Sequence, residues 1–297
     1  MKTLLFIYNP AAGKGQISGV LSPILEVFAR TGWLVTVYPT QKKGDATHIA
    51  RGFGSHFDRV VCAGGDGTLS ETATGLVALE QAPPLGYIPV GSTNDCATTL
   101  ALPRDPIQAA AIAATGIPCT SDIGQLNGQP FVYVAAFGAF TQVAYETPQD
   151  LKNTLGHLAY VLGGIASLPT ITPYHLKVEY DGHTLEDDFY FGMVCNALSI
   201  GGIRIPKKER LVLDDGLFEV DLVKKPVSLA DVAGGFQSLV DQNTLSAGSR
   251  VHFQASHVRF TCDRPIPCTI DGEYGGNASV SRVDNCRRAL TIIRGER

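Results

Sequence analysis

The stretch RVVCAGGDGTLSETATGLVALEQ, residues 59–81, decides the fold class of this chain. It opens with an apolar run, passes through the turn Gly64-Gly65-Asp66-Gly67-Thr68, and continues with apolar residues at helical spacing. We expect a helix over 68–81 that begins with a capping box between Thr68 and Glu71. A buried strand, a glycine-rich turn and a helix in this order are typical of a βα unit in a parallel sheet.

The first 120 residues repeat this alternation of strand and helix. Short apolar runs occur at Leu4–Tyr8, Leu34–Tyr38 and Gly86–Val90, and Pro106–Thr115 is a further Ala-rich helical pattern. Alternating β and α units predict a doubly wound parallel sheet with helices on both faces. We therefore expect an α/β domain over residues 1–120.

After Pro118 the pattern changes to strands separated by turns, and residues 121–297 are predicted to form a mostly antiparallel β-sandwich. Asn127-Gly128 and Asp181-Gly182 are hairpin signals. Two helical stretches, at about 149–168 and 229–239, interrupt the strands. We leave open that the C-terminal end packs back on the first domain.

Composition excludes several classes of protein. The 297 residues are 44% hydrophobic and 18% charged with a net charge of −4, which argues against disorder and against a general nucleic-acid binder. Seven cysteines without a C-x-x-C pair argue against a disulfide framework and a zinc ribbon, and favour a reduced, cytosolic setting. No segment reaches the roughly 18 apolar residues that indicate a membrane span.

The GGDGT turn has the chemistry of a phosphate site. Glycines let the backbone approach a phosphate closely, and the start of a helix offers free N–H groups and positive dipole. Asp66 would repel a bare phosphate, so its carboxylate is favourable there if a magnesium ion lies between them. The alternative is a tight βα turn in which Asp66 serves only as a cap.

Two further turns follow predicted parallel strands. Asn9-Pro10-Ala11-Ala12-Gly13-Lys14-Gly15 is neither a Walker A loop nor a Rossmann fingerprint, and Gly91-Ser92-Thr93-Asn94-Asp95 combines hydroxyls, an amide and an acid. Ligands of doubly wound sheets bind at the carboxyl ends of the strands, where these turns are expected. Ordinary Asx-type turns are the alternative.

In Asp271-Gly272-Glu273, in the β-rich half, two carboxylates flank a glycine in a tight turn. In an extended segment the two side chains would share a face, because the period of a strand is two. Such a pair can supply a general base and a partner that orients it or holds metal. The alternative is an exposed Asp-Gly turn.

Together these motifs resemble the diacylglycerol kinase catalytic-domain family of bacterial lipid kinases, which is related to sphingosine kinases, over nearly the whole chain. Leu213-Asp214-Asp215-Gly216-Leu217 is similar to the metal segment of that family, and GGDGT and D-G-E match its motifs. GGDGT alone is shared with NAD kinases and phosphofructokinases, whereas the three motifs in this order are more specific. One departure is Thr98, which stands where the family often has arginine.

The resemblance implies an NAD-kinase-like nucleotide-binding domain over 1–120, a lipid-substrate domain over 121–297, and roles for individual residues. Magnesium is expected on the carboxylate of Asp215 and the carbonyls of Val212 and Leu217. Asp66, Asp95 and Glu273 would hold or orient magnesium and water, and either Asp271 or Glu273 would accept the proton. The residues implied in ATP binding are Asn9, Gly13, Thr40, Gly65, Asp66, Gly67, Thr68, Glu71, Ser92, Asn94 and Asp95.

The implied activity is ATP-dependent transfer of the γ-phosphate to the hydroxyl of a diacylglycerol-like lipid alcohol. The implied location is cytoplasmic and peripheral to the inner face of the membrane, with no nucleic-acid partner, and a homodimer is left open. One alternative is a soluble-substrate kinase of the NAD-kinase type. The other is a nucleotide-binding regulator without catalysis, which the missing arginine would favour.

Overall fold

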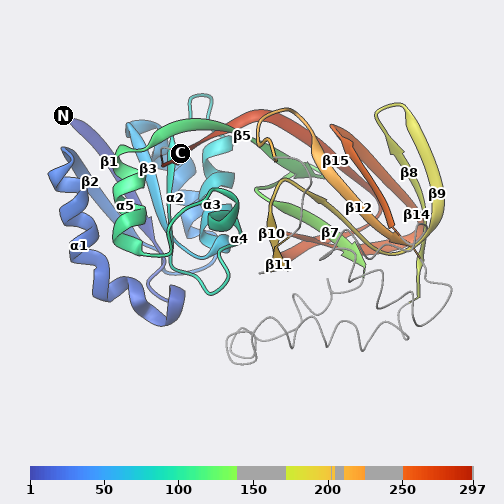
Figure 1. Ribbon diagram of the computed structural model, residues 1–297, viewed down its shortest axis with the longest axis horizontal. Helices are drawn as coiled ribbons and strands as arrows, with labels where there is room; N and C mark the ends of the chain where they lie inside the picture. Colours follow the sequence, from blue (N-terminus) through green and yellow to red (C-terminus); the bar gives the residue numbers. More distant parts are fainter. Residues whose placement is uncertain (139–171, 202, 205–210, 225–249, 296–297) are drawn as a thin grey trace. The chain divides into compact units, whose positions relative to one another are not determined.

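The computed structural model describes residues 1–138, 172–201, 203–204, 211–224 and 250–295 (Figure 1). The chain forms two compact units, residues 1–122 with 287–297 (unit 1) and residues 123–286 (unit 2). It passes from unit 1 to unit 2 within strand β5 (Ile117–Leu126) and returns within strand β15 (Glu273–Arg294). The helical stretches expected at 149–168 and 229–239 lie outside the described residues.

Unit 1 contains a parallel sheet made from the apolar runs of the first half. Its strands lie in the order β4-β3-β1-β2, and Ile292 of β15 pairs in parallel with Leu85 of β4. The four strands match the expected positions to within about two residues at their ends. Their bounds are β1 Lys2–Tyr8, β2 Trp33–Pro39, β3 Arg59–Gly64 and β4 Leu85–Pro89.

Helices alternate with these strands, as expected for a doubly wound sheet (Figure 1). Helix α1 packs against α5, and helix α2 packs against α3. The α1–α5 side buries large apolar residues such as Phe6 and Phe28 against the alanines of α5. The bounds are α1 Gln16–Arg30, α2 Asp45–Phe53, α3 Asp66–Val77, α4 Asp95–Thr99 and α5 Pro106–Thr115.

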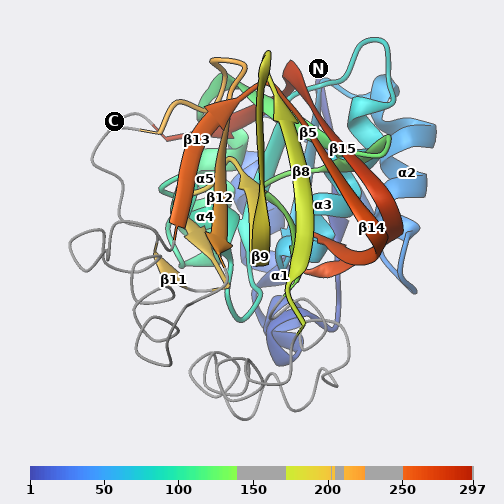
Figure 2. The ribbon, with the colours of Figure 1, turned by 90° about the vertical axis from the view of Figure 1, so that its right-hand side faces the viewer.

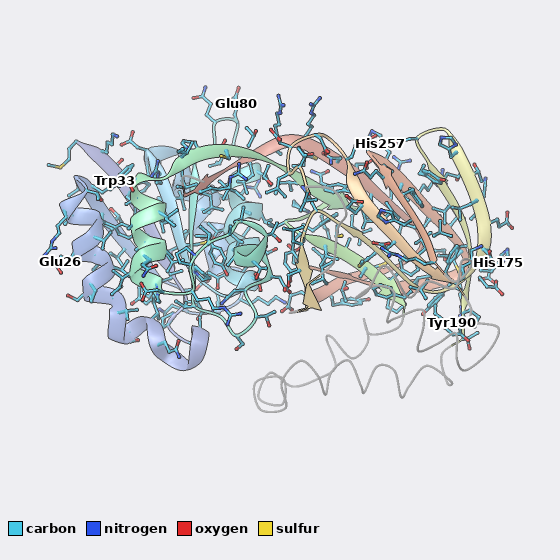
Figure 3. All side chains as sticks on the ribbon, viewed as in Figure 1. Glu26, Trp33, Glu80, His175, Tyr190 and His257 are labelled. Atoms are coloured by element: carbon cyan, nitrogen blue, oxygen red, sulfur yellow. The ribbon has the colours of Figure 1, made fainter. Side chains whose placement is uncertain are left out.

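Helix α5 shows how local sequence and tertiary contacts cooperate. It begins where predicted, because the Asp105 carboxylate accepts the Gln108 N–H at 2.8 Å and Pro106 occupies the first turn. Trp33 (labelled in Figure 3) donates its Nε1 N–H to the Ala114 carbonyl, at the other end of this helix, at 3.1 Å. Arg59 Nη1 donates to the same carbonyl at 2.7 Å. A cation and an indole thus bind the negative end of the helix and tie it to β2 and β3.

Unit 2 is mostly antiparallel, with strand order β13-β12-β9-β7-β14-β15. Strand β8 also pairs with both β9 and β14 and lies between them (Figure 2). Strand β7 pairs with other residues of the same two strands. The short strands β10 (Ser199–Ile200) and β11 (Ile203–Arg204) pair separately. The other bounds are β6 Gln129–Phe131, β7 Val134–Gly138, β8 Tyr174–Tyr180, β9 His183–Cys195, β12 Phe218–Lys224, β13 Arg250–Ala255 and β14 His257–Ile270.

Two-residue Asx-Gly turns set the register of the hairpins in unit 2. Asn127-Gly128 and Asp181-Gly182 both have positive φ at both positions, which confirms the two hairpin predictions. Asp271-Gly272 forms a third turn of this kind, with φ of +48° and +81°. The structure therefore has the tight turn expected at Asp271-Gly272-Glu273, and not the extended segment in which the two carboxylates would share a face.

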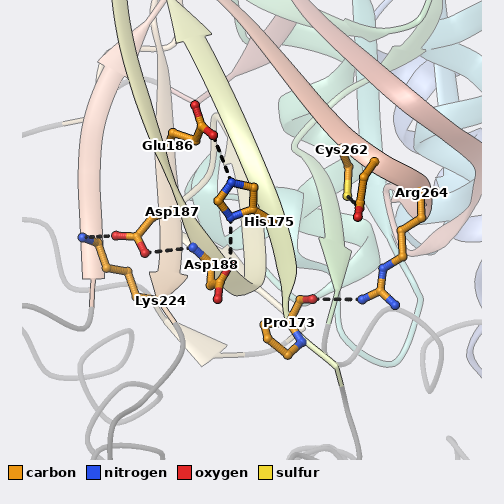
Figure 4. Close-up of polar contacts among 9 residues, drawn as sticks. Pro173, His175, Glu186, Asp187, Asp188, Lys224, Cys262 and Arg264 are labelled. Carbon is orange, nitrogen blue, oxygen red and sulfur yellow. Dashed lines mark hydrogen bonds and ion pairs between the residues drawn. The ribbon is translucent and has the colours of Figure 1, made fainter.

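Polar pairs across β8 and β9 fix the register of this hairpin on its outer face (Figure 4). The ring of His175 lies between Asp188, at 2.9 Å, and Glu186, at 3.0 Å, and these two bonds raise the pKa of the imidazole. Asp187 pairs with Lys224 of β12 at 2.7 Å. Opposite charges on neighbouring strands favour one alignment over slipped ones.

Candidate functional site

The turns after the parallel strands of unit 1 come together at one edge of its sheet. Asn9, which follows β1, donates its N–H to the Ala63 carbonyl of β3 at 2.9 Å. Thr40, which follows β2, donates its N–H to the Tyr8 carbonyl of β1 at the same distance. Val90, which follows β4, bonds in the same way to Gly64. The expected ATP-binding segments are therefore neighbours at the carboxyl ends of the strands.

Two glycines let these turns touch each other. Gly13 has a φ of +57°, and a Cβ there would lie 2.1 Å from the Val90 carbonyl oxygen. A Cβ on Gly91 would lie 2.5 Å from Cα of Gly65. Any side chain at either position would push the loops apart. These glycines are required by packing between loops, with or without a ligand.

Gly67 is different, because outside its own stretch of helix no atom of the described residues lies within 4 Å of the Cβ that it lacks. It is exposed in the first turn of α3 and has ordinary helical φ. Glycine in a helix costs about 1 kcal/mol relative to alanine, and packing does not require it here. Open space beside the N-terminus of a helix is what a phosphate needs in order to reach the backbone N–H groups.

Asp66 does serve as a cap in the structure, but of helix α4 rather than of the helix that follows its own turn. Its Oδ2 accepts the N–H of Asp95 at 3.0 Å, and its Oδ1 accepts the N–H of Cys96 at 3.1 Å. These are orphan donors at the start of α4, so the carboxylate caps that helix. Asp66 thereby joins the GGDGT turn to the turn that carries Asp95, whose side chain is buried.

Asn94 supports the third turn through its side chain, which bonds to the backbone of Gly91. Its φ of +57° lies in the left-handed region, which asparagine tolerates. Its Oδ1 accepts the Gly91 N–H at 2.9 Å, and its Nδ2 donates to the Gly91 carbonyl at 2.7 Å. Ser92, within this turn, is exposed. Thr98, where the family often has arginine, donates its hydroxyl to the Asn94 carbonyl at 3.5 Å.

Tyr87 is a supporting residue that the sequence analysis missed. It is buried in β4, and its hydroxyl lies 3.3 Å from both the Gly64 carbonyl and Asn94 Oδ1. Burial, and then the negative charge of Asp66, hold the pKa of this phenol well above its usual range. A tyrosine inside an otherwise apolar strand was the available signal, since a buried hydroxyl needs a partner.

The capping box expected between Thr68 and Glu71 is wrong. Helix α3 begins at Asp66, so Thr68 is already inside the helix and cannot be its N-cap. Glu71 Oε1 instead accepts the N–H of Gly44 at 2.8 Å, next to the start of α2. Glu71 thus connects α3 to the loop that begins at Thr40, the second expected nucleotide contact.

In unit 2 the turn between β14 and β15 separates its two carboxylates. Asp271 is buried, whereas Glu273 is exposed, so the two side chains do not share a face. Asp271 accepts three backbone N–H groups, from Val132 at 2.8 Å, Tyr133 at 3.0 Å and Val134 at 3.1 Å. A carboxylate has about four lone-pair sites, so most of them are used. Asp271 therefore anchors the turn between β14 and β15 to the backbone at the start of β7.

The D-D-G-L segment forms a turn closed by Asp215, whose Oδ1 accepts the Leu217 N–H at 2.9 Å. Gly216 has a φ of +91°, and the Asp215 side chain is exposed. Asn196, a second residue that the sequence analysis missed, donates Nδ2 to the neighbouring Leu213 carbonyl at 3.2 Å. No signal in its local sequence, Val-Cys-Asn-Ala, distinguishes it.

The chemistry of this segment fits magnesium. The expected donors are the Asp215 carboxylate and the carbonyls of Val212 and Leu217, all of them oxygens, which a hard cation prefers. Among the described residues, no group of three or more His, Cys, Asp or Glu side chains could hold a metal ion. A site with one carboxylate and main-chain oxygens is of another kind, and it would leave positions for several waters.

In the part of the chain that the structure describes, no helix has the length and apolar character needed to cross a membrane. All seven cysteines are free thiols. Burial raises the pKa of the Cys62 thiol to about 12, so this cysteine is an inert part of the core.

Comparisons with known proteins agree with this geometry. The diacylglycerol kinase catalytic domain family matches residues 3–126, and the YegS C-terminal NAD kinase beta sandwich-like domain matches residues 134–294. The second match confirms the sandwich class predicted for the β-rich half.

Curated relatives match over most of their length. A diacylglycerol kinase of Bacillus subtilis (strain 168) is 35% identical over 93% of this chain and 91% of its own. A diacylglycerol kinase of Staphylococcus saprophyticus is 34% identical over 93% and 90%. Both matches therefore extend over most of the two halves of the chain.

Among solved structures, the chain superposes on a Bacillus anthracis str. Sterne crystal structure that carries the provisional name diacylglycerol kinase. The TM-score is 0.84 at 27% identity, covering 99% of this chain and 95% of that one. With the site geometry and the curated relatives, this places the chain in the diacylglycerol kinase family, whose members are lipid kinases.

Proposed function

We propose that this chain is an ATP-dependent kinase that transfers the γ-phosphate to the hydroxyl of a diacylglycerol-like lipid alcohol. The observation that carries the proposal is the meeting of the glycine-bearing turns at one sheet edge, with open space at Gly67. The names of the curated relatives support diacylglycerol as the acceptor. We further propose that the protein acts at the inner face of a membrane as a peripheral protein.

In this proposal the turns of unit 1 bind ATP through backbone N–H groups, and each has a distinct part. Gly65 and Gly67 allow close approach of the phosphates, Gly13 lets its loop lie against Val90, and Thr40 and Ser92 offer hydroxyls. Asp66, Glu71 and Asn94 hold the turns in place through the bonds described above. Magnesium, when bound, would neutralise the charge on the transferring phosphate.

The proton acceptor in this proposal is Glu273 rather than Asp271. The Asp271 carboxylate already accepts three N–H bonds and is buried, whereas Glu273 is exposed at the start of β15. The lipid hydroxyl oxygen attacks the γ-phosphorus, and the bond from that phosphorus to the β–γ bridging oxygen breaks. ADP leaves, and the hydroxyl proton passes to Glu273. Asp271 positions the turn that carries this base.

The test uses the purified chain, ATP labelled in the γ-phosphate, and separate acceptors. Diacylglycerol in mixed micelles should yield labelled phosphatidic acid. Phosphatidylglycerol, a sphingoid base and a polyprenol are offered in parallel, to show which class of lipid alcohol is phosphorylated. NAD tests the soluble-substrate alternative. Labelled NADP in place of labelled lipid would contradict the proposal. ATP binding without transfer to any acceptor would favour the non-catalytic regulator.

The location is tested separately by sedimentation with vesicles. Binding to vesicles that contain diacylglycerol, measured without ATP, is the expected result. Recovery of all the protein in the supernatant at every lipid composition would contradict a peripheral membrane role.

A further inference from the structure

Asn196, which follows strand β9, connects two segments of unit 2 that are far apart in the sequence. Its backbone N–H donates to the Tyr133 carbonyl at 3.0 Å, and its Nδ2 donates to the Leu213 carbonyl at 3.2 Å. The N–H of Tyr133 in turn donates to Asp271 Oδ1 at 3.0 Å. Through these bonds the turn closed by Asp215 is tied to the chain that holds the D-G-E turn.

The other end of the Asn196 side chain is a buried acceptor. The residue is only 3% exposed, and its Oδ1 has no hydrogen-bond partner within the described part of the chain. A buried acceptor without a hydrogen bond destabilises the fold by about 1–3 kcal/mol, and most buried polar atoms in native proteins therefore have a partner. Bound water is the usual partner of an amide oxygen in this situation.

We propose that Asn196 is a positioning residue for the phosphoryl transfer proposed above, on which this inference rests. Its Nδ2 holds the Asp215 turn, and its Oδ1 accepts a hydrogen bond from a water molecule on the magnesium ion bound there. Magnesium retains several waters when it has few protein ligands, and each water is a donor. Both ends of the amide thus act on the metal turn, and the backbone N–H bond of Asn196 to the Tyr133 carbonyl ties that turn to the chain that holds Asp271.

The expected size of the effect follows from how strictly phosphoryl transfer depends on placement. Displacement of a reacting group by about 1 Å can cost about a hundredfold in rate. Loss of the bond to Leu213 frees the Asp215 turn while the strands on either side stay paired. The rate should therefore fall much more than the affinity for ATP, since the ATP-binding turns belong to unit 1.

Two variants distinguish the effect of the amide donor, Nδ2, from the effect of the amide acceptor, Oδ1. Asn196→Leu has a similar size and removes both the donor and the acceptor. Asn196→Asp keeps an acceptor oxygen but no longer donates to the Leu213 carbonyl, and it keeps the test open if the leucine variant does not fold. Asn285→Leu is the matched control, because it removes another asparagine with a buried side-chain oxygen from the same unit.

Three measurements are made on the full chain. The first is the rise in Tm caused by magnesium chloride without nucleotide or lipid, which should be smaller in Asn196→Leu than in wild type. The second is hydrogen exchange of residues 211–217, which should be faster in both Asn196 variants. The third is the kinetics, in which kcat should fall about 10- to 100-fold while the KM for ATP stays unchanged.

Wild-type exchange and wild-type magnesium stabilisation in the Asn196 variants would overturn the inference. It would also be overturned if Asn285→Leu produced the same changes, since they would then report a general loss of stability. Failure of the proposed function would look different. In that case the wild-type chain would transfer no phosphate, while exchange and magnesium stabilisation would still report on Asn196.

Discussion

At the residue scale, variants of the two carboxylates in the D-G-E turn should distinguish the residue that accepts the proton from the residue that positions the turn. Glu273→Gln keeps the size of the exposed side chain but removes the base, so kcat should fall about 10²–10⁴-fold with Tm unchanged. Asp271→Asn replaces one acceptor oxygen by an NH₂ group that faces backbone N–H donors. Its unfolding free energy should drop by about 1–3 kcal/mol.

Thermal unfolding and lipid-kinase kinetics of the two variants check this division. The affinity for ATP is the control and should stay at the wild-type value in Glu273→Gln. If Asp271→Asn lost rate without losing stability, the assignment of the base to Glu273 would have to be reversed.

Gly67 tests whether the open space in the first turn of α3 receives a phosphate. Gly67→Ala should leave the fold intact or stabilise it by up to about 1 kcal/mol, because nothing lies within 4 Å of the added Cβ. The Kd for ATP should nevertheless rise about tenfold, which corresponds to about 1.4 kcal/mol. Calorimetric titration with ATP and magnesium measures this.

Gly19→Ala in α1 is the matched control for Gly67→Ala. Gly19 is also exposed in a helix, and a Cβ there also meets nothing within 4 Å. It should give the same gain in stability without a change in ATP binding. Equal ATP affinities in the two variants would remove the main support for a phosphate at Gly67.

His252 should make the stability of unit 2 depend on pH. Hydrogen bonds to Asp221, at 3.0 Å, and to Glu219 raise the pKa of the imidazole from 6.5 to about 9. A raised pKa means that the folded state binds the proton more tightly, so the full stabilisation is present below pH 6.5. It is lost as the pH rises through about 9.

Urea unfolding between pH 6 and 10 measures this contribution. His252→Gln should flatten the fall in stability between pH 6.5 and 9 relative to wild type. The difference between variant and wild type isolates His252 from the other titrating groups. A His252→Gln curve that falls as steeply as the wild-type curve over this window would contradict the assignment.

At the element scale, the five-residue helix α4 depends on a residue from a different turn. Asp66 caps it with both carboxylate oxygens, across 29 and 30 positions of sequence. Asp66→Asn keeps one acceptor and places an NH₂ group against the second N–H. The unfolding free energy should fall by about 0.5–2 kcal/mol, as for other lost N-caps.

Hydrogen exchange of residues 94–99 is the direct measurement, and it should become faster in Asp66→Asn. Turnover should fall together with it, because the turn that carries Ser92 and Asp95 loosens. Asp105→Asn, at the N-terminus of α5, is a control in which the cap to Gln108 is preserved by the remaining oxygen. Unchanged exchange at 94–99 would show that α4 does not need the second oxygen.

At the scale of the whole molecule, unit 1 is completed by the last strand of the chain. The end of β15 pairs with β4, and Ile293 is fully buried although it lies about 200 residues after that strand. Ile293→Ala should cost about 2–5 kcal/mol of unfolding free energy. ATP binding should weaken as well, since unit 1 holds the nucleotide turns.

Thermal unfolding with and without ATP and magnesium measures both effects. Thr291→Ala, two positions earlier and only half-buried, should cost much less. Equal losses in the two variants would mean that the strand contributes to unit 1 only through its backbone.

Much of the fold could be predicted because it depends on local chemistry. The strands of unit 1 follow from short apolar runs, α5 follows from Asp105, Pro106 and an alanine stretch, and the hairpins follow from Asx-Gly pairs. These signals act over two to ten residues and need no knowledge of the rest of the chain. The turns at the sheet edge could be placed for the same reason, since strand ends define them.

What only the tertiary structure decided is which groups bind the polar side chains in those turns. Asp66 binds α4, Glu71 binds the start of α2, and Asp271 binds N–H groups 137 to 139 positions away. The sequence pattern suggested a capping box for Glu71 and a shared face for Asp271. A periodic pattern reports which face a residue occupies, whereas the partner of a buried polar group depends on which distant backbone donors the completed fold leaves unsatisfied.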